Sequence, residues 1–239
     1  MPRVSIRSVF TLLLALGLAA CAGPEVRVAR ESAGSAPAAV DPPLASGDKD
    51  VMAALMAGEF AWQDGRAASA ARHFGRAAAL SDDAAIAEHA TRVAIVAREW
   101  ALAAEGLARW RKLAPDAAGI TQSEAAVALG TGDRALATRL LSGLLLRDDA
   151  DSRRMVGQVL LAGSEPAAAV AVVEQLAADS SLPGGVETRM LLSQLAQQLR
   201  QPELALKLAK AAVATDPASA PALLWQGHVA LRSGDREGA

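Results

Sequence analysis

The stretch that decides the fold is ALKLAKAAVATDPASAPALLWQGHVALRSGDREGA, which occupies residues 205–239. Two alanine-rich runs of helical character are separated by Pro217, and a second break follows at Gly234 and Asp235. Proline ends a helix, glycine adopts the positive φ of a tight turn, and aspartate caps the helix that follows. The stretch therefore predicts antiparallel helices joined by short turns.

The same punctuation recurs along the chain with a period near 34 residues, which resembles the tetratricopeptide repeat. In that family the eighth and twentieth positions lie where the two helices of a unit cross, so only a small residue fits. Gly227 and Ala239 match those positions in the last unit, and Ala205 matches the twentieth position one unit earlier. The other residues that fit the frame are Gly58, Gly65, Ala70, Phe74, Ala77, Ala103, Pro115, Gly132, Asp133, Ala137, Ala212 and Pro217, with Gly157 and Ala169 as the best anchors of the least regular unit, Met155–Ala178.

The composition points to the same fold class. Hydrophobic residues make up 52% of the chain and aromatic residues only 3%, and alanine is the commonest of the apolar residues. Alanine favours helices, whereas strands favour β-branched and aromatic residues. We therefore predict an all-α, right-handed superhelical solenoid of antiparallel helix pairs, with about six units over residues 51–239 and the last unit incomplete. Since a solenoid needs a polar terminal cap, we expect the natural chain to continue beyond Ala239. The alternative is an unrelated alanine-rich helical bundle.

The N-terminus is typical of an export signal. Arg3 and Arg7 precede the apolar run Val9–Ala20, which is shorter than the about 20 residues that span a bilayer. The run ends in LAAC, with Cys21 last, and this ending resembles the bacterial lipobox. The resemblance implies that Cys21 receives a diacylglycerol, that cleavage follows before it, and that the new amine is acylated. The sequence thus predicts a signal peptide over residues 1–20; the alternative is an ordinary cleaved signal with a coincidental cysteine.

The segment after the cysteine is predicted to be a tether. It contains four prolines among Gly, Ser and Ala and shows no apolar periodicity, which favours a lipidated N-terminus and flexible linker over residues 21–50. Ala22 follows the cysteine, in place of the aspartate that retains many lipoproteins in the inner membrane. The resemblance therefore implies a lipid anchor at the periplasmic face of the outer membrane. A single cysteine also excludes an intramolecular disulfide.

We find no pattern of residues that predicts a catalytic, metal or cofactor site. His73, His89 and His228 are isolated in sequence, which favours solvated or core-edge positions over metal ligation. The carboxylate pairs Asp82–Asp83 and Asp148–Asp149 precede helices, where they stabilise a helix N-terminus. The net charge of −2, with acids and bases interspersed, excludes the basic surface of a nucleic-acid-binding protein. We therefore interpret the chain as a non-enzyme.

A protein-binding surface is predicted from the repeat register. In the tetratricopeptide family the first helix of each unit lines an extended concave face, so the resemblance implies that this face binds a protein or peptide. The expected lining is polar and rich in amides suited to hydrogen-bonding an extended backbone. Its residues are Glu59, Trp62, Gln63, Glu88, Arg92, Gln122, Arg154, Gln158, Gln194, Gln197, Gln198, His228 and Arg232. The alternative is that these are ordinary solvated helix faces, and that Trp62, like Trp100, Trp110 and Trp225, mainly fills the core.

The start of the array resembles a narrower group of proteins. The runs AGEFA at 57–61, AEHATRVA at 87–94 and LAPD at 113–116 are similar to tetratricopeptide lipoproteins of proteobacteria that act as adaptors for a periplasmic carboxyl-terminal processing protease. This resemblance covers about residues 51–120. It implies a scaffold that holds the protease and its cell-wall hydrolase substrates together at the outer membrane. Two alternatives stay open: a pilotin-like or outer-membrane assembly lipoprotein, and an enzyme whose catalytic domain lies beyond residue 239.

The predicted anchor has a direct test. Each buried methylene contributes about 0.8 kcal/mol, so two or more acyl chains hold a protein firmly at a membrane. We expect Cys21→Ala to release the chain from membranes into the soluble fraction, as measured by sedimentation of separated envelope fractions. Continued sedimentation of the variant with the outer membrane would contradict the lipoprotein assignment.

Overall fold

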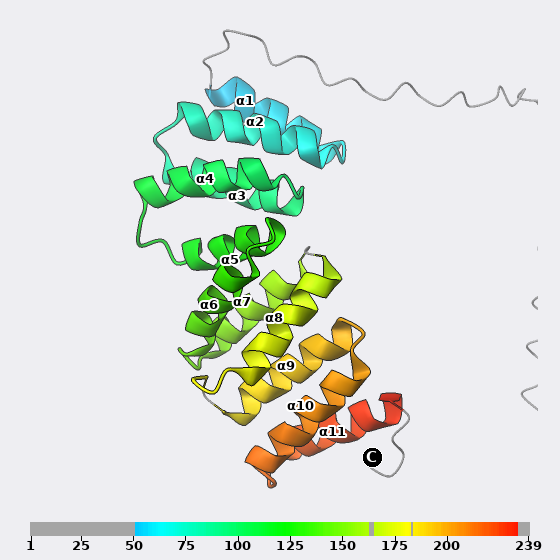
Figure 1. Ribbon diagram of the computed structural model, residues 1–239. Coiled ribbons are helices and arrows are strands. Elements are labelled where there is room, and N and C mark those ends of the chain that lie inside the picture. The colour runs from blue at the N-terminus through cyan, green and yellow to red at the C-terminus, as the bar shows by residue number, and fades with distance from the viewer. Residues whose placement is uncertain (1–50, 163–164, 183, 234–239) are drawn as a thin grey trace, which may run out of the picture. The chain divides into compact units, whose positions relative to one another are not determined.

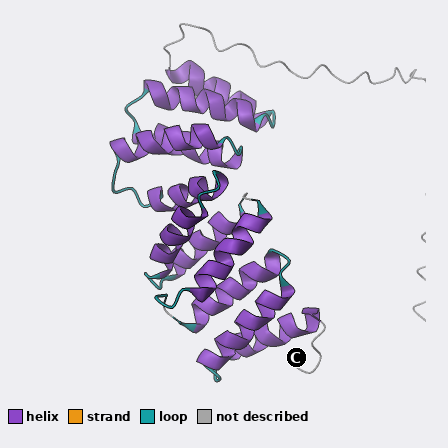
Figure 2. Ribbon diagram, in the orientation of Figure 1, coloured by secondary structure: helices purple, strands orange, loops and turns teal. Residues whose placement is uncertain are grey.

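The computed structural model describes residues 51–162, 165–182 and 184–233, and these ranges contain eleven α-helices and no strand (Figure 1; Figure 2). The helices are α1 (Val51–Gln63), α2 (Ala67–Leu80), α3 (Ala84–Val96), α4 (Trp100–Leu113), α5 (Ile120–Gly130), α6 (Arg134–Leu145), α7 (Ala150–Leu161), α8 (Pro166–Ala178), α9 (Val186–Gln198), α10 (Pro202–Thr215) and α11 (Ala220–Ser233). Cys21, the predicted signal peptide and the predicted linker lie outside the described residues. Within the described ranges, no helix combines the length and the apolar character needed to cross a bilayer.

Most consecutive helices pack against each other as hairpins that follow one another along the chain (Figure 1), whereas α7 and α8 contact α6 and α9 more extensively than they contact each other. The most extensive contacts join α1 to α2, α3 to α4, and α9 to α10, and α5 packs likewise against α6. The remaining extensive contacts join a helix to the next or the next but one, as between α5 and α7. Such nearest-neighbour packing defines a solenoid, in which each unit buries its apolar face against its neighbours. The predicted all-α solenoid of helix pairs is therefore confirmed, and the alternative of an unrelated bundle is not.

The turns inside four hairpins share one backbone geometry. Gly65, Arg98, Gly132 and Arg200 have φ values of 73°, 58°, 87° and 60°, so each adopts the left-handed conformation. In every case the next residue donates its backbone N–H to the carbonyl five residues before it, at 2.8–2.9 Å. This hydrogen bond closes a helix C-terminus in the Schellman manner. The sequence pattern predicted the two glycine turns, whereas the two arginine turns carry no glycine signal.

The crossings within hairpins require small residues, as the repeat frame predicts. A Cβ atom added to Gly58 of α1 would lie 2.8 Å from the Phe74 ring of α2, and one added to Gly106 of α4 would lie 2.8 Å from Thr91 Oγ1 of α3. Seven alanines of the frame are at most 1% exposed: Ala70, Ala77, Ala103, Ala137, Ala169, Ala205 and Ala212. Close packing of two helices therefore accounts for the small residues at these positions. It does not account for Gly157 or Gly227, where an added Cβ atom would lie 3.9 Å from Leu191 Cδ1 and more than 4 Å from any atom, respectively.

The apolar interior consists of two clusters that meet at α5. The first draws on α1 to α5 and includes Phe74 and Trp110, and the second draws on α5 to α11 and includes Leu141. Val127 belongs to the first cluster, and its neighbour Ala128 belongs to the second. α5 therefore contributes buried residues to both apolar clusters, from different sides of the helix.

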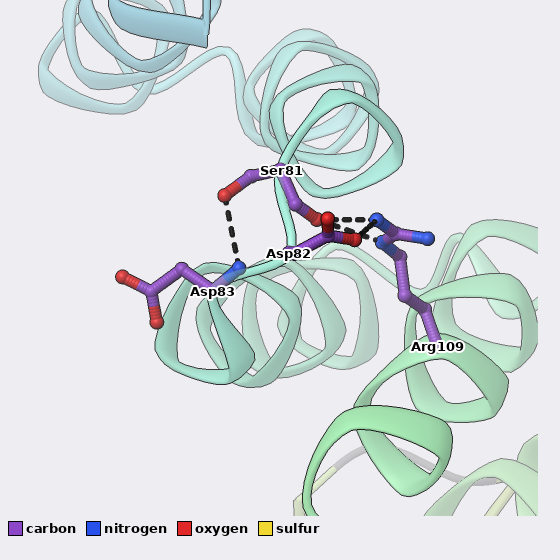
Figure 3. A network of polar contacts seen from close by, with 4 residues as sticks. All are labelled: Ser81, Asp82, Asp83 and Arg109. Carbon is purple, nitrogen blue, oxygen red and sulfur yellow. Dashed lines mark hydrogen bonds and ion pairs between the residues drawn. The ribbon is translucent and has the colours of Figure 1, made fainter.

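A polar network fixes the link between the first two hairpins (Figure 3). Arg109 of α4 donates from Nε to the Ser81 carbonyl at 3.0 Å and pairs through Nη2 with Asp82 Oδ1 at 2.9 Å. The Ser81 hydroxyl accepts the backbone N–H of Asp83 at 3.0 Å, and Asp83 Oδ1 in turn accepts the N–H of Ala85 at 2.8 Å. One arginine of the second hairpin thus holds the loop that leads into that hairpin.

The left-handed arginines lead to a stability prediction. A non-glycine residue in this conformation costs about 1–2 kcal/mol, and glycine adds about 0.5–1 kcal/mol of unfolded-state entropy to be lost on folding. We expect Arg98→Gly to raise the free energy of unfolding by about 0.5–1 kcal/mol, the difference between those two terms. Urea denaturation followed by circular dichroism measures the change.

Gly132→Ala is the matched control. A Cβ atom at Gly132 would meet no atom within 4 Å, so its effect comes from the backbone conformation alone. We expect this variant to lower the free energy of unfolding by about 1 kcal/mol or more. If both Arg98→Gly and Gly132→Ala were less stable than the wild type, the inference that Arg98 is conformationally strained would be wrong.

Candidate protein-binding groove

A first pocket lies across the first helices of three successive hairpins. It has a volume of about 410 Å³. Its lining residues are Arg92, Ile95 and Val96 of α3, Gln122, Ser123 and Ala126 of α5, Gln158 and Val159 of α7, and Ala162. Arg92, Gln122 and Gln158 are three of the residues that the repeat register assigns to the concave face. The structure therefore brings these three together, from segments far apart in the sequence.

A second pocket continues the first onto the next hairpin. It has a volume of about 310 Å³ and is lined by Arg153, Arg154, Gly157, Gln158 and Leu161 of α7 and by Leu191, Gln194, Leu195 and Gln198 of α9. Gln158 lines both pockets, so they form one surface, which we call the odd-helix groove. Four of the predicted concave-face residues lie in this second part: Arg154, Gln158, Gln194 and Gln198.

Glutamine amides run along the groove at equivalent positions. Gln122, Gln158 and Gln194 stand 36 residues apart on α5, α7 and α9. Gln122 Nε2 donates to Gln158 Oε1 at 2.9 Å, which fixes the orientation of both side chains. Each amide has two donor hydrogens and an acceptor oxygen with two lone pairs, so most of this capacity stays available to a ligand.

The charges of the groove are largely compensated within the chain. Arg92 forms an ion pair with Glu88 one helical turn away, and Arg154 Nη2 lies 3.0 Å from Asp151 Oδ1. Exposed pairs of this kind contribute little to stability, but they reduce the net field of the surface. The groove is therefore polar and hydrogen-bonding rather than strongly charged. An apolar wall accompanies the amides, since Val96 is 63% exposed beside Arg92.

The remaining predicted residues lie outside these two pockets. Glu59, Trp62 and Gln63 are exposed at the C-terminal end of α1, with Trp62 41% exposed, and His228 and Arg232 are exposed on α11. Glu88 of α3 is half-buried and reaches the first pocket only through its ion pair with Arg92. Gln197 of α9 is half-buried, and its Oε1 atom has no hydrogen-bond partner among the described residues. The pockets thus connect the middle of the predicted face and not its two ends.

The aromatic residues divide between core and surface. Trp110 is 1% exposed, as expected of a core residue, and Trp100 covers Gly130 at the end of α5. Trp225 is half-buried, donates from Nε1 to Ser193 Oγ at 2.8 Å and stacks on His228 with ring centroids 5.3 Å apart. Trp225 therefore joins α11 to α9 while it supports a residue of the predicted face.

The histidines show no sign of metal ligation. His73 is buried and His89 is exposed, with its ring edge-to-face against Phe74 at 4.5 Å. Within the described ranges, no group of three His, Cys, Asp or Glu side chains is placed to hold a metal ion. The core-edge and solvated positions predicted for the histidines agree with this arrangement.

The paired aspartates do two different jobs. The second member of each pair caps a helix: Asp83 accepts from Ala85 N on α3, and Asp149 accepts from Ser152 N at 2.7 Å on α7. The first member binds an arginine instead, Asp82 to Arg109 (Figure 3) and Asp148 to Arg153 at 2.8 Å. The prediction of helix N-terminal stabilisation therefore holds for one residue of each pair.

Asp149 caps α7, the helix that lines both pockets of the groove. The backbone N–H of Ser152 and its hydroxyl donate hydrogen bonds to the Asp149 carboxylate, and these bonds lower the pKa of Asp149 below its usual range.

Asp179 shows the same effect in the loop after α8, where hydrogen bonds from Ser181 and, to a smaller extent, from Ser142 lower its pKa. The Ser142–Asp179 and Thr138–Gln175 hydrogen bonds bridge α6 and α8 beside a wide hollow of about 890 Å³ that contains none of the predicted face residues.

Comparison with known proteins gives similarities of fold at low identity. A scan against protein-family models and a search of curated proteins found no match to this sequence. Similar solved structures include YrrB, described as a TPR protein with an unusual peptide-binding site, at 14% identity and a TM-score of 0.39 over 79% of this chain and 94% of that one. The TPR domain of P58(IPK) has 18% identity and a TM-score of 0.33 over 79% of this chain and 57% of that one. The C-terminal part of a TPR repeat-containing protein from Cytophaga hutchinsonii has 15% identity and a TM-score of 0.38, over 78% and 72%. Because these scores are low, the fold assignment rests on the helix pairs themselves.

The cap on α7 predicts a pH-dependent stability. We expect Asp149→Ala to lower the free energy of unfolding at neutral pH, because the first turn of α7 loses its acceptor. A carboxyl with a depressed folded-state pKa stabilises the fold above its unfolded pKa, and that contribution is lost as the pH falls through the folded pKa. The difference between wild type and variant should therefore shrink on acidification below the usual range of an aspartate. Urea denaturation at a series of pH values measures it.

Asp149→Asn serves as the control for the cap. The amide keeps a neutral oxygen that accepts the same hydrogen bonds, so it should lose less stability than the alanine variant at neutral pH. A difference between wild type and Asp149→Ala that stayed constant across the acid range would show that the carboxylate charge at this position contributes nothing.

Proposed function

We propose that this chain is a protein-binding scaffold whose odd-helix groove holds an extended segment of a partner protein. The observation that carries the proposal is the pair of adjoining pockets over α3, α5, α7 and α9, which meet at Gln158. Amides with spare donors and acceptors suit the N–H and C=O groups of an extended backbone, which satisfies its own hydrogen bonds only in a helix or sheet.

An extended polypeptide could cross the groove from helix to helix. Packed helices lie about 8–10 Å apart, and an extended chain rises about 3.3 Å per residue. A segment laid across α5, α7 and α9 would therefore pass from one helix to the next in about three residues, with the hydrogen-bonded amides of Gln122 and Gln158 between the first two. The apolar wall at Ile95 and Val96 offers a contact for an apolar side chain of the same segment. Recognition would thus depend more on backbone conformation than on ligand charge.

The setting of this scaffold follows from the N-terminal sequence. The lipobox-like ending at Cys21 supports a lipid anchor at the periplasmic face of the outer membrane, and the linker over residues 21–50 would let the array stand away from the lipid. The runs at 57–61 and 87–94 support a role as adaptor for a carboxyl-terminal processing protease. In that role the groove would hold either the protease or a cell-wall hydrolase that it processes.

Substitution of the three equivalent glutamines tests the groove. We expect the Gln122→Ala, Gln158→Ala, Gln194→Ala triple variant to bind the partner about 100-fold more weakly, since each lost hydrogen bond costs about 1 kcal/mol. A pull-down from envelope extract with the lipidated wild-type chain identifies the partner, and calorimetry with that partner measures the affinities.

Gln175→Ala is the matched control, because Gln175 is an exposed glutamine of α8 that bonds Thr138 outside the groove. It should leave the affinity unchanged. Equal affinity of the triple variant and wild type would reject the groove as the binding surface. Recovery of a pilus secretin in place of a protease or hydrolase would keep the scaffold and replace the adaptor role with a pilotin role.

A further inference from the structure

The first helix presents an apolar stripe on the side opposite to its packed face. Met52, Met56 and Phe60 are 61%, 51% and 59% exposed and follow one another at four-residue spacing, which places them on one side of α1. Ala54 and Ala61 on the other side are 5% and 0% exposed, where α1 packs against α2. The three large side chains therefore form one surface, which we call the α1 stripe.

The charges near the α1 stripe do not favour an electrostatic partner. Glu59 is the only charged residue among the 13 of α1, and the helix contains no Lys or Arg. A helix without basic residues has no charge attraction for anionic headgroups or for nucleic acid. Any contact at the stripe must therefore gain its free energy from burial of apolar side chains.

The size of the stripe argues against a free protein partner or a second copy. A stable protein interface buries about 800 Å² on each side and involves about 20–30 residues per partner, whereas the stripe has three large side chains. So small a contact persists only where the chain is already held close to its target. The sequence supplies such a hold, because just 29 residues separate Cys21 from the start of α1 at Val51.

We propose that the α1 stripe inserts into the lipid surface to which the chain is anchored, so that α1 lies along the bilayer. This inference rests on the lipid anchor of the proposed function and is independent of what the groove binds. The 29 residues between Cys21 and Val51, if they form the predicted flexible linker, would span on average about 30 Å and keep the stripe at an effective concentration of about 1 mM near the membrane. At that concentration a weak apolar contact suffices. Because no basic residue takes part, neutral lipid is the expected surface and salt has little effect.

Methionine oxidation reports directly on the stripe. Met52 and Met56 are exposed, whereas Met155 of α7 and Met190 of α9 are half-buried and serve as internal controls. The lipidated full chain in phosphatidylcholine vesicles is treated with dilute peroxide beside the Cys21→Ala chain without vesicles. We expect Met56 to oxidise about fivefold more slowly in vesicles, since a stripe inserted for about four-fifths of the time is exposed for the rest. Met155 and Met190 should oxidise equally in both samples.

Two surface variants separate the stripe from apolar exposure in general. Phe60→Ser should remove most of the protection of Met56, because it replaces the largest apolar side chain of the stripe by a polar one and so weakens an already weak contact. Leu224→Ser should leave that protection unchanged, because Leu224 is 76% exposed on α11, outside the stripe. Full protection in the Phe60→Ser chain would overturn the proposal.

The outcomes distinguish the stripe from the anchor. A wild-type chain that sediments with vesicles but oxidises at Met56 as fast as Cys21→Ala overturns the stripe and leaves the anchor standing. A wild-type chain that does not sediment with vesicles overturns both. Protection of Met56 that appears in Cys21→Ala without vesicles and grows with protein concentration assigns the stripe to a second copy, which also overturns the proposal.

Discussion

The hairpins of this chain depend on small residues at the points where two helices pack most closely, and at Gly58 and Gly106 only glycine fits between them. Gly58 lies against the Phe74 ring, and alanines occupy the corresponding crossings farther along. Alanine buries little apolar area, so a single crossing contributes little free energy. The larger side chains, such as Trp110 and Leu141, are buried in clusters that extend over several hairpins. A single hairpin therefore does not bury enough apolar surface to be stable alone. Each hairpin depends on contacts with the hairpins that come before and after it in the sequence.

The turns show what the sequence pattern can and cannot predict. Gly65 and Gly132 can be recognised as turn residues in the sequence because glycine, which has no Cβ atom, adopts positive φ without steric strain. Arg98 and Arg200 occupy the same place in the repeat and the same conformation, yet an arginine there looks like any other exposed residue. The backbone period is thus more regular than the residue pattern.

Most of the polar residues that line the two pockets were predicted from the sequence, but Ser123 and Arg153 and the apolar residues were not. Counting positions within the repeat identified Arg92, Gln122 and Gln158, because the first helix of each unit faces the same side. The wall at Ile95 and Val96 was missed, since an apolar residue near a helix end is indistinguishable in sequence from a core residue. The only available signal was the exposure of Val96, which needs the neighbouring helices to be in place. Likewise, no pattern separates a capping aspartate from an ion-paired one in an Asp-Asp pair.

The division of the core at α5 has a consequence for how local unfolding of the array and ligand binding influence each other. Two clusters with a shared boundary helix form two cooperative units, each of which can open while the other stays folded. The odd-helix groove begins on α3, in the first unit, and ends on α9, in the second. A segment bound along its whole length would span that boundary and bind only when both units are folded. Occupancy would then stabilise both units together by mass action, so binding and the folding of the whole array would be coupled.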